Sequence, residues 1–248
     1  MNLLYVYDFK VIKIMIYFRG CVLREKIPEI ADATENILKK AGIEHEVLEE
    51  EGCCGSFLLR TGFHDDAMEV MEQTHRKLEG HKVLVSCAGC YNTLKNDYKK
   101  FLGVELDVIH TSQLFSQIIR EGKLEVQKTS MKVTYHDPCH LGRHSGVYDE
   151  PRKVLEAVAE LVEMKDVREM SHCCGAGAGV KSAFPETASQ MGVKRIKEAE
   201  NTGAETLVTA CSFCILNLED AVNHSENHHL KVKDLSEILL MGLDDERI

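Results

Sequence analysis

Short apolar runs alternate with longer amphipathic stretches along most of the chain. In the first half, apolar runs predict strands at residues 11–17, 45–48, 82–86 and 106–110. Apolar positions at helical spacing predict helices at residues 27–41, 65–78, 91–101 and 111–120. The second half repeats the alternation, with strands at 132–136, 161–163, 205–209 and 230–232 and helices at 151–159, 186–201, 213–223 and 235–240. Strands that alternate with helices predict an α/β fold with parallel sheets and helices on their faces.

The ten cysteines form two sets with the same internal order: one cysteine, then an adjacent pair followed by glycine, then a C-x-x-C motif. The first set is Cys21, Cys53, Cys54, Cys87 and Cys90, and the second set is Cys139, Cys173, Cys174, Cys211 and Cys214. Flanking residues repeat as well, as in KVLVSCAGC and TLVTACSFC. Such a repeat indicates duplication of one structural unit. We therefore predict two tandem Rossmann-like units with parallel sheets, at residues 12–122 and 130–242, joined by the polar stretch 123–129.

Charge and hydropathy argue against several classes of protein. The chain carries 30 Lys and Arg against 40 Asp and Glu, a net charge of −10, whereas a nucleic-acid partner favours a basic surface. No apolar run approaches the roughly 18 residues of a membrane-spanning helix. Charged residues interrupt the apolar start, which argues against a secretory signal and for a cytoplasmic protein with reduced thiols. Residues 1–11 are either an extra strand or an extension from an upstream start codon.

The cysteine pattern favours metal chemistry. Cys21, Cys87, Cys139 and Cys211 follow predicted strands, and ligands of parallel α/β sheets gather at the carboxyl ends of the strands. Zinc takes four ligands, whereas each set offers five thiols, and adjacent cysteines can reach different irons of a polynuclear cluster. Iron–sulfur ligation is therefore the favoured interpretation, with zinc in one set as the alternative.

Several segments carry a family resemblance: FRGCVLR, HDPCHLGRHSGVYDEPRKVLE, CCGAGAGVKSAFPE and TACSFCILNLEDA. They resemble the cysteine-rich CCG domains of the heterodisulfide reductase family, especially the catalytic half of the membrane-linked CoB–CoM heterodisulfide reductase D subunit of methanogenic archaea. The resemblance implies that the five cysteines of each set hold a noncubane 4Fe–4S cluster. It also implies that a substrate disulfide is cleaved between the two clusters. Some relatives carry zinc in the first set.

The resemblance further implies an oxidoreductase subunit that reduces the mixed disulfide of coenzymes M and B (CoM-S-S-CoB) to two thiols. Its electrons would come from a ferredoxin-like iron–sulfur subunit, which is served by a flavin subunit or a membrane cytochrome b. The protein would then be cytoplasmic or peripheral to a membrane through a partner. The same superfamily includes electron-transfer subunits of lactate, glycolate, glycerol-3-phosphate and succinate oxidoreductases. An electron-transfer role in a flavin dehydrogenase is therefore the alternative function.

Two protons are needed when a disulfide is reduced to two thiols. We expect His140, which follows Cys139, to act as the acid, because the pKa of histidine lies near neutrality. The alternative is that His140 and the nearby His136, His144 and His172 hydrogen-bond cluster sulfurs, backbone or water.

A polyanionic substrate also requires cations at the crevice. The candidates are basic residues near the motif cysteines: Arg143 first, then Arg24, Arg60 and Lys181. Arg143 leads because it lies within the segment that carries the resemblance.

Overall fold

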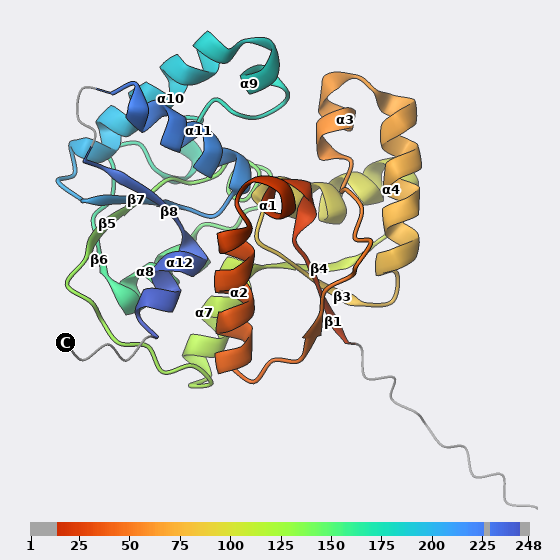
Figure 1. The fold of residues 1–248 in the computed structure, drawn as a ribbon, viewed down its shortest axis with the longest axis horizontal. Coiled ribbons are helices and arrows are strands. Elements are labelled where there is room, and N and C mark those ends of the chain that lie inside the picture. Colours follow the sequence, from red (N-terminus) through yellow and green to blue (C-terminus); the bar gives the residue numbers. More distant parts are fainter. Residues whose placement is uncertain (1–13, 226–228, 244–248) are drawn as a thin grey trace, which may run out of the picture.

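Each half of the chain forms one four-stranded parallel sheet in the computed structural model, which describes residues 14–225 and 229–243 (Figure 1). The first sheet has the order β2-β1-β3-β4 and consists of β1 (Met15–Phe18), β2 (His45–Glu46), β3 (Lys82–Val85) and β4 (Asp107–His110). The second has the equivalent order β6-β5-β7-β8 and consists of β5 (Lys132–Tyr135), β6 (Glu160–Leu161), β7 (Thr206–Thr209) and β8 (Lys231–Asp234). Two parallel sheets of the same order confirm the predicted α/β fold of duplicated Rossmann-like units.

Helices connect the strands of both sheets. The first half contains α1 (Gly20–Lys26), α2 (Pro28–Lys40), α3 (Ser56–Thr61), α4 (His64–Leu78), α5 (Ala88–Asn92), a π-helical turn (Thr93–Asp97), α6 (Tyr98–Leu102) and α7 (Thr111–Arg120). The second half contains α8 (Asp149–Val158), a 3-10 turn (Arg168–Met170), α9 (Val180–Ala183), α10 (Pro185–Glu200), α11 (Ser212–Asn223) and α12 (Leu235–Met241). None of the helices within these described ranges is long and apolar enough to cross a lipid bilayer.

The sequence missed the short helices α1, α3 and α9. They lie at turns around the cysteine motifs and are too short to show a helical period of apolar residues. The helix predicted at 91–101 is real, but a π-helical turn interrupts it between α5 and α6. The part of the first predicted strand before residue 14, together with residues 1–11, lies outside the described residues.

The same local signal starts the last helix of each unit. His110 at the end of β4 accepts a hydrogen bond from the backbone N–H of Ser112, and the Gln113 side chain accepts one from the backbone N–H of His110. Asp234 and Glu237 form the equivalent capping box at the start of α12. A capping box pairs backbone N–H groups that the first helical turn leaves free. The repeated segments LDVIHTSQLF and LKVKDLSEIL therefore fold alike.

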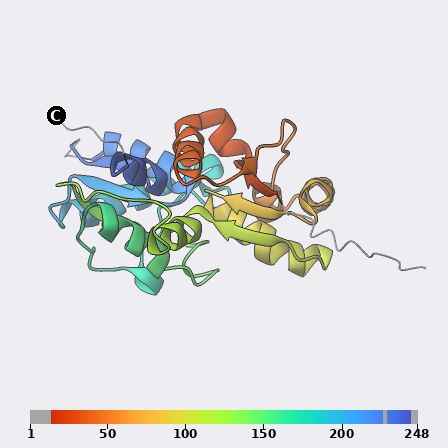
Figure 2. The same ribbon diagram turned by 90° about the horizontal axis from the view of Figure 1, so that it is seen from below.

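The two units pack against each other through helices. α7 lies against α8, and α12 lies against α2 (Figures 1 and 2). One continuous cluster of buried apolar side chains includes strand residues of both sheets. The division of the chain at residues 123–129 stays a prediction, because the two sheets share this core.

Candidate metal centres

The two cysteine sets line two neighbouring cavities. A cavity of about 20 Å³ is lined by all five cysteines of the first set: Cys21, Cys53, Cys54, Cys87 and Cys90. A cavity of about 40 Å³ is lined by all five cysteines of the second set: Cys139, Cys173, Cys174, Cys211 and Cys214. Both cavities are also lined by Ser56, Phe57, Gly89 and Phe213. The fold thus brings each predicted set of thiols together and places the two sets beside the same four residues.

Strand ends and helix starts deliver these thiols. Cys87 and Cys211 lie two residues after β3 and β7 and form the N-caps of α5 and α11. Cys90 and Cys214 follow three residues later on the same helices, one turn further along. The C-x-x-C spacing therefore directs both sulfurs to the carboxyl edge of the sheet, where ligands of parallel sheets bind.

All ten cysteines are free thiols. The sulfur atoms are 3.9 Å apart in the pair Cys21–Cys53, 3.4 Å in Cys54–Cys90 and 3.2 Å in Cys174–Cys214. These distances exceed the roughly 2.05 Å of a disulfide bond. The sulfurs are close enough to share a metal centre without being covalently joined.

Hydrogen bonds within the sets stabilise thiolates. The hydrogen bond from Cys21 lowers the pKa of Cys53 to about 3, and the one from Cys139 lowers the pKa of Cys173 to about 2. The backbone N–H groups two residues later also donate to these two sulfurs, at 3.5 and 3.4 Å. The thiolate is the form of cysteine that binds metal. Each set therefore holds a cysteine already favoured in its ligand form.

Cys87 and Cys211 connect the two sets. Their hydrogen bond lowers the pKa of Cys87 well below its usual value. Because Cys87 follows a strand of the first sheet and Cys211 a strand of the second, this contact joins the two units at their cysteine edges. The two candidate centres therefore adjoin each other.

The donor sets fit thiolate-bound metal centres. Five thiols border each cavity, one more than tetrahedral zinc takes. The adjacent cysteines of the first pair contact each other and also have different further partners, Cys21 for Cys53 and Cys90 for Cys54. Neighbours with different further partners suit ligands of different irons in one cluster.

Two buried carboxylates hold the residues that directly precede the first cysteine of each set. Glu51 accepts hydrogen bonds from the backbone N–H of Arg19 at 2.5 Å and from the guanidinium of Arg24 at 2.9 Å. Asp137 accepts a bidentate pair from Arg152 at 2.7 and 2.9 Å. Arg24, a candidate substrate contact, is thus engaged with Glu51. Neither carboxylate stands out in the sequence, because its partners are distant along the chain.

A wider cavity of about 580 Å³ adjoins the second set and is lined by residues of both units. His140 borders this cavity, and its Nε2 accepts a hydrogen bond from Nε of Arg60 at 3.2 Å. Arg60 also donates to Asp97 at 2.7 Å. Burial, followed by the charge of Arg60, lowers the pKa of His140 to about 4. The imidazole is therefore neutral near pH 7, with its proton on Nδ1.

The four basic residues proposed to bind an anionic substrate lie at different places in the fold. Arg143 is exposed and donates to two backbone carbonyls, at 3.2 and 2.6 Å. Lys181 forms an ion pair with Asp220. Arg60 borders both the 40 Å³ and the 580 Å³ cavities. Of the four candidates, Arg60 is therefore the one that these two cavities bring beside the second cysteine set.

The sequence matches the family model of the CCG cysteine-rich domain at residues 15–95 and 133–219. The chain belongs to the CCG cysteine-rich domain family. This CCG protein is 40% identical to a dihydromethanophenazine:CoB–CoM heterodisulfide reductase chain of Methanosarcina acetivorans, over 92% of this chain and 59% of that protein. It is 36% identical to a fumarate reductase (CoM/CoB) chain of Methanothermobacter marburgensis, over 93% of this chain and 46% of that protein. The family resemblance expected from the motifs is confirmed.

A third relative of this CCG protein is EtfAB:quinone oxidoreductase of Syntrophomonas wolfei, 32% identical over 92% of this chain and 34% of that protein. The chain thus spans 34% to 59% of the length of these three relatives. Among solved structures, glutamate racemase RacE1 of Bacillus anthracis aligns at 12% identity with a TM-score of 0.40, over 92% of this chain and 79% of that chain. That likeness is too low to support an argument, whereas the three sequence relatives are all named as reductases or oxidoreductases.

Proposed function

We propose that this CCG protein reduces a disulfide to two thiols at a crevice between two iron–sulfur clusters. The observation that supports the proposal is the pair of adjoining cavities, each lined by five thiols. Reduction of a disulfide takes two electrons and two protons and yields two thiols. When bound, two clusters would supply one electron each.

The proposed ligands are the two cysteine sets. The first set would hold one noncubane 4Fe–4S cluster within the unit 12–122, and the second set would hold another within the unit 130–242. Because the thiols follow the same order in both sets, we expect both cavities to hold the same kind of cluster. Zinc in the first set, beside one cluster in the second, is the alternative.

The wide cavity beside His140 suits the substrate. We propose CoM-S-S-CoB, which carries a sulfonate, a carboxylate and a phosphate, because two of the relatives described above are named for these coenzymes. Arg60 borders the cavity and can bind an anionic group of the substrate. To serve as the acid, His140 must first be protonated to the imidazolium, which its pKa of about 4 makes rare at pH 7, and would then give that proton to a product thiolate. Arg143 would meet substrate only outside this cavity.

The electrons would come from partner subunits. We propose a ferredoxin-like iron–sulfur subunit, followed by a flavin subunit or a membrane cytochrome b, with the chain in the cytoplasm or peripheral to a membrane. A second candidate function is electron transfer for a flavin dehydrogenase. The similarity to EtfAB:quinone oxidoreductase favours that alternative.

Metal analysis tests the cofactors. Anaerobically prepared protein is expected to contain about eight irons and eight sulfides per chain, as two four-iron clusters require. Cys173→Ala is expected to remove the signal of the second cluster by electron paramagnetic resonance (EPR), and the matched Cys53→Ala that of the first. One zinc with about four irons would contradict the two-cluster proposal.

Turnover tests the reaction. Reduced viologen and CoM-S-S-CoB are expected to yield both thiols when the protein holds its clusters. A protein with two intact clusters that leaves the disulfide intact, yet accepts electrons from a flavin dehydrogenase, would support electron transfer instead.

A further inference from the structure

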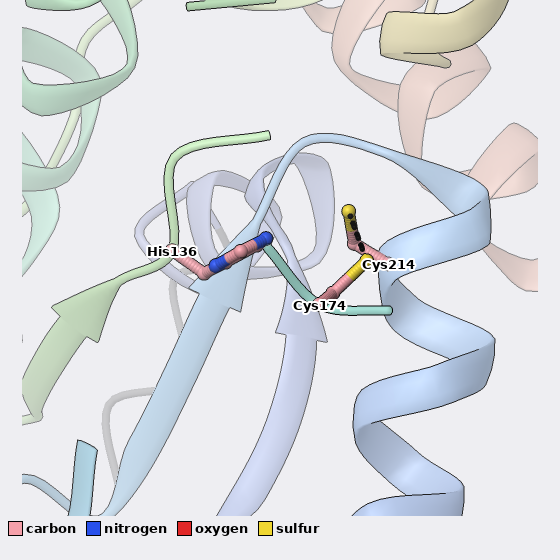
Figure 3. Close-up of side chains that lie close together, drawn as sticks. All are labelled: His136, Cys174 and Cys214. Carbon is pink, nitrogen blue, oxygen red and sulfur yellow. Dashed lines mark hydrogen bonds between the residues drawn. The ribbon is translucent and has the colours of Figure 1, made fainter. Parts of the chain in front are cut away.

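The side chain of His136 points from the carboxyl end of β5 toward the second cysteine set (Figure 3). The residue is 1% exposed, and a ring nitrogen lies within 4.8 Å of the sulfurs of Cys174 and Cys214. Nδ1 accepts a hydrogen bond from Nε of Arg195 at 3.2 Å. Nε2 is buried and has no hydrogen-bond partner within residues 14–225 and 229–243. Because an unpaired buried polar group destabilises the folded state, this nitrogen requires a partner at the cysteine site.

Arg195 decides which ring nitrogen of His136 carries the proton. Its guanidinium is fully buried and also donates to Glu198 at 2.6 Å, Ser171 at 3.1 Å and the carbonyl of Asp166 at 3.0 Å. A guanidinium has donors and no acceptor, so Nδ1 of His136 must present its lone pair. A protonated ring would carry hydrogens on both nitrogens and could not accept this bond, so the ring is neutral, with its hydrogen on Nε2.

This tautomer distinguishes a donor from a ligand. A histidine nitrogen that binds metal must be deprotonated, and the other nitrogen of such a ring usually donates a hydrogen bond. In His136 the other nitrogen accepts, and the free nitrogen carries the hydrogen. His136 is thus a hydrogen-bond donor beside Cys174 and Cys214, and not a third metal ligand with them.

The first unit has different residues at these places. Phe18 at the end of β1 occupies the position of His136 at the end of β5, three residues before the first cysteine of its set. Thr74 on α4 occupies the position of Arg195 on α10, seven residues after an alanine whose carbonyl faces the glycine of the CCG motif. Phe18 is fully buried and offers no side-chain donor. The histidine–arginine pair therefore distinguishes the second site from the first.

We propose that Nε2–H of His136 donates a hydrogen bond to the metal centre of the second cysteine set and so raises its reduction potential. The inference rests on the proposed function, which places an iron–sulfur cluster there. A donor aimed at cluster sulfur or thiolate stabilises the more negative, reduced state more than the oxidised state. Arg195 acts as the positioning residue. The hydroxyl of Ser212 borders the first cavity and offers a hydrogen-bond donor there. The inference therefore concerns the reduction potential of the second centre alone and does not rank the potentials of the two centres.

A redox titration followed by EPR tests the inference on the anaerobically loaded full chain. His136→Phe, which copies the residue of the first unit, is expected to shift the midpoint potential of the second centre to a more negative value. The potential of the first centre and the iron content are expected to stay unchanged. His136→Gln keeps an N–H donor of similar reach and is expected to recover most of the shift. The two signals are assigned with Cys173→Ala and Cys53→Ala.

Labelling with 15N-histidine gives a second readout in the wild-type protein. Pulsed EPR of the reduced second centre is expected to detect a weakly coupled histidine nitrogen that disappears in His136→Phe. Strong coupling, as from a directly bound nitrogen, would make His136 a ligand and overturn the inference. Absence of any histidine coupling would overturn it as well.

Controls separate this inference from the proposed function. Phe18→Leu is the matched change in the first unit and is expected to leave the potential of the second centre unchanged. An unchanged second potential in His136→Phe, with iron intact, would overturn the inference alone. Wild-type protein without iron in the second set would overturn the proposed function and the inference together.

Discussion

Burial keeps the histidines beside the cysteine sets neutral. It is the largest cause that lowers the pKa of His110 and His140 to about 4 and that of His136 to about 3. Each ring also has a fixed partner: Ser112 for His110, Arg60 for His140 and Arg195 for His136. A neutral ring with a fixed tautomer presents one donor and one acceptor in known directions. These histidines can therefore direct hydrogen bonds without adding charge near the thiolates.

His140→Gln tests the acid role. Glutamine can still accept a hydrogen bond from Arg60, but it cannot release and regain a proton during turnover. Because general acids typically contribute 100-fold or more, kcat is expected to fall by about 100-fold while iron content stays at the wild-type value. Steady-state kinetics with reduced viologen across pH measures the effect. An unchanged kcat and pH profile would show that His140 has only a hydrogen-bonding role.

His110 predicts how stability depends on pH. The unfolded chain binds a proton near pH 6.5, whereas burial lowers the pKa of folded His110 to about 4. The folded state therefore binds fewer protons between these values, and stability falls as the pH is lowered through this range. Between pH 7 and pH 5, His110 accounts for a loss of about 2 kcal/mol in the free energy of unfolding.

The variant His110→Asn isolates this contribution. Asparagine can still cap α7, but it does not titrate. The free energy of unfolding of the variant is therefore expected to change less between pH 7 and pH 5 than that of the wild type. Urea unfolding at both pH values, with iron content monitored, measures the difference. An equal change in the free energy of unfolding between the two pH values for both proteins would contradict the prediction.

Each CCG motif ends on a glycine in the left-handed region of backbone conformation. Gly55 has φ 80° and precedes α3, and Gly175 has φ 94° and faces α10. These values lie in the left-handed region, where a side chain costs roughly 1–2 kcal/mol. The two glycines differ in what a Cβ would meet. At Gly175 it would lie 2.7 Å from the carbonyl oxygen of Ala188, whereas at Gly55 the nearest atom, at 2.8 Å, belongs to the side chain of Met71.

The two alanine variants should therefore differ. Both incur the backbone cost, but the Met71 side chain can move away, whereas the backbone of α10 cannot. Gly175→Ala is expected to lower the free energy of unfolding by more than Gly55→Ala and to lose iron from the second set. Urea unfolding and iron analysis measure both effects. Equal losses in the two variants would mean that backbone strain alone sets the cost.

The whole molecule assembles a site that neither unit contains by itself. Arg60 of the first unit contacts His140 of the second, and Cys87 contacts Cys211 across the same junction. Helix packing between the units sets these contacts, because α7 lies against α8 and α12 against α2. The substrate cavity therefore depends on the relative placement of the two units.

Arg60→Gln tests this shared site. A charge-assisted hydrogen bond contributes about 1.5–3 kcal/mol, so KM for an anionic disulfide is expected to rise by about tenfold or more while iron content is retained. Arg143→Gln is the matched control, because Arg143 bonds backbone carbonyls on an exposed loop. Steady-state kinetics of both variants measures KM. A larger rise for Arg143→Gln would restore Arg143 as the substrate contact.

Local pattern was enough to predict the strands, the long helices and the grouping of the cysteines. Strand and helix periods are local, and the C-x-x-C motifs follow strands whose ends share one edge. The short helices α1, α3 and α9 escaped, because they are set by turns and by left-handed glycines such as Gly55 and Gly179. The sequence favours Arg143 because it lies near Cys139 along the chain, whereas Arg60 borders the cavities because of how the two units pack. The substrate role of Arg143 stays a prediction.

The sequence by itself determined that two similar units each offer five thiols at the carboxyl edge of a parallel sheet. Only the tertiary structure decided which side chains face those thiols. The contact of Arg60 with His140 and that of Arg195 with His136 join residues 80 and 59 positions apart. The physical reason is that the direction of a buried hydrogen bond depends on how helices pack on the sheets, and the local order of residues does not encode that packing.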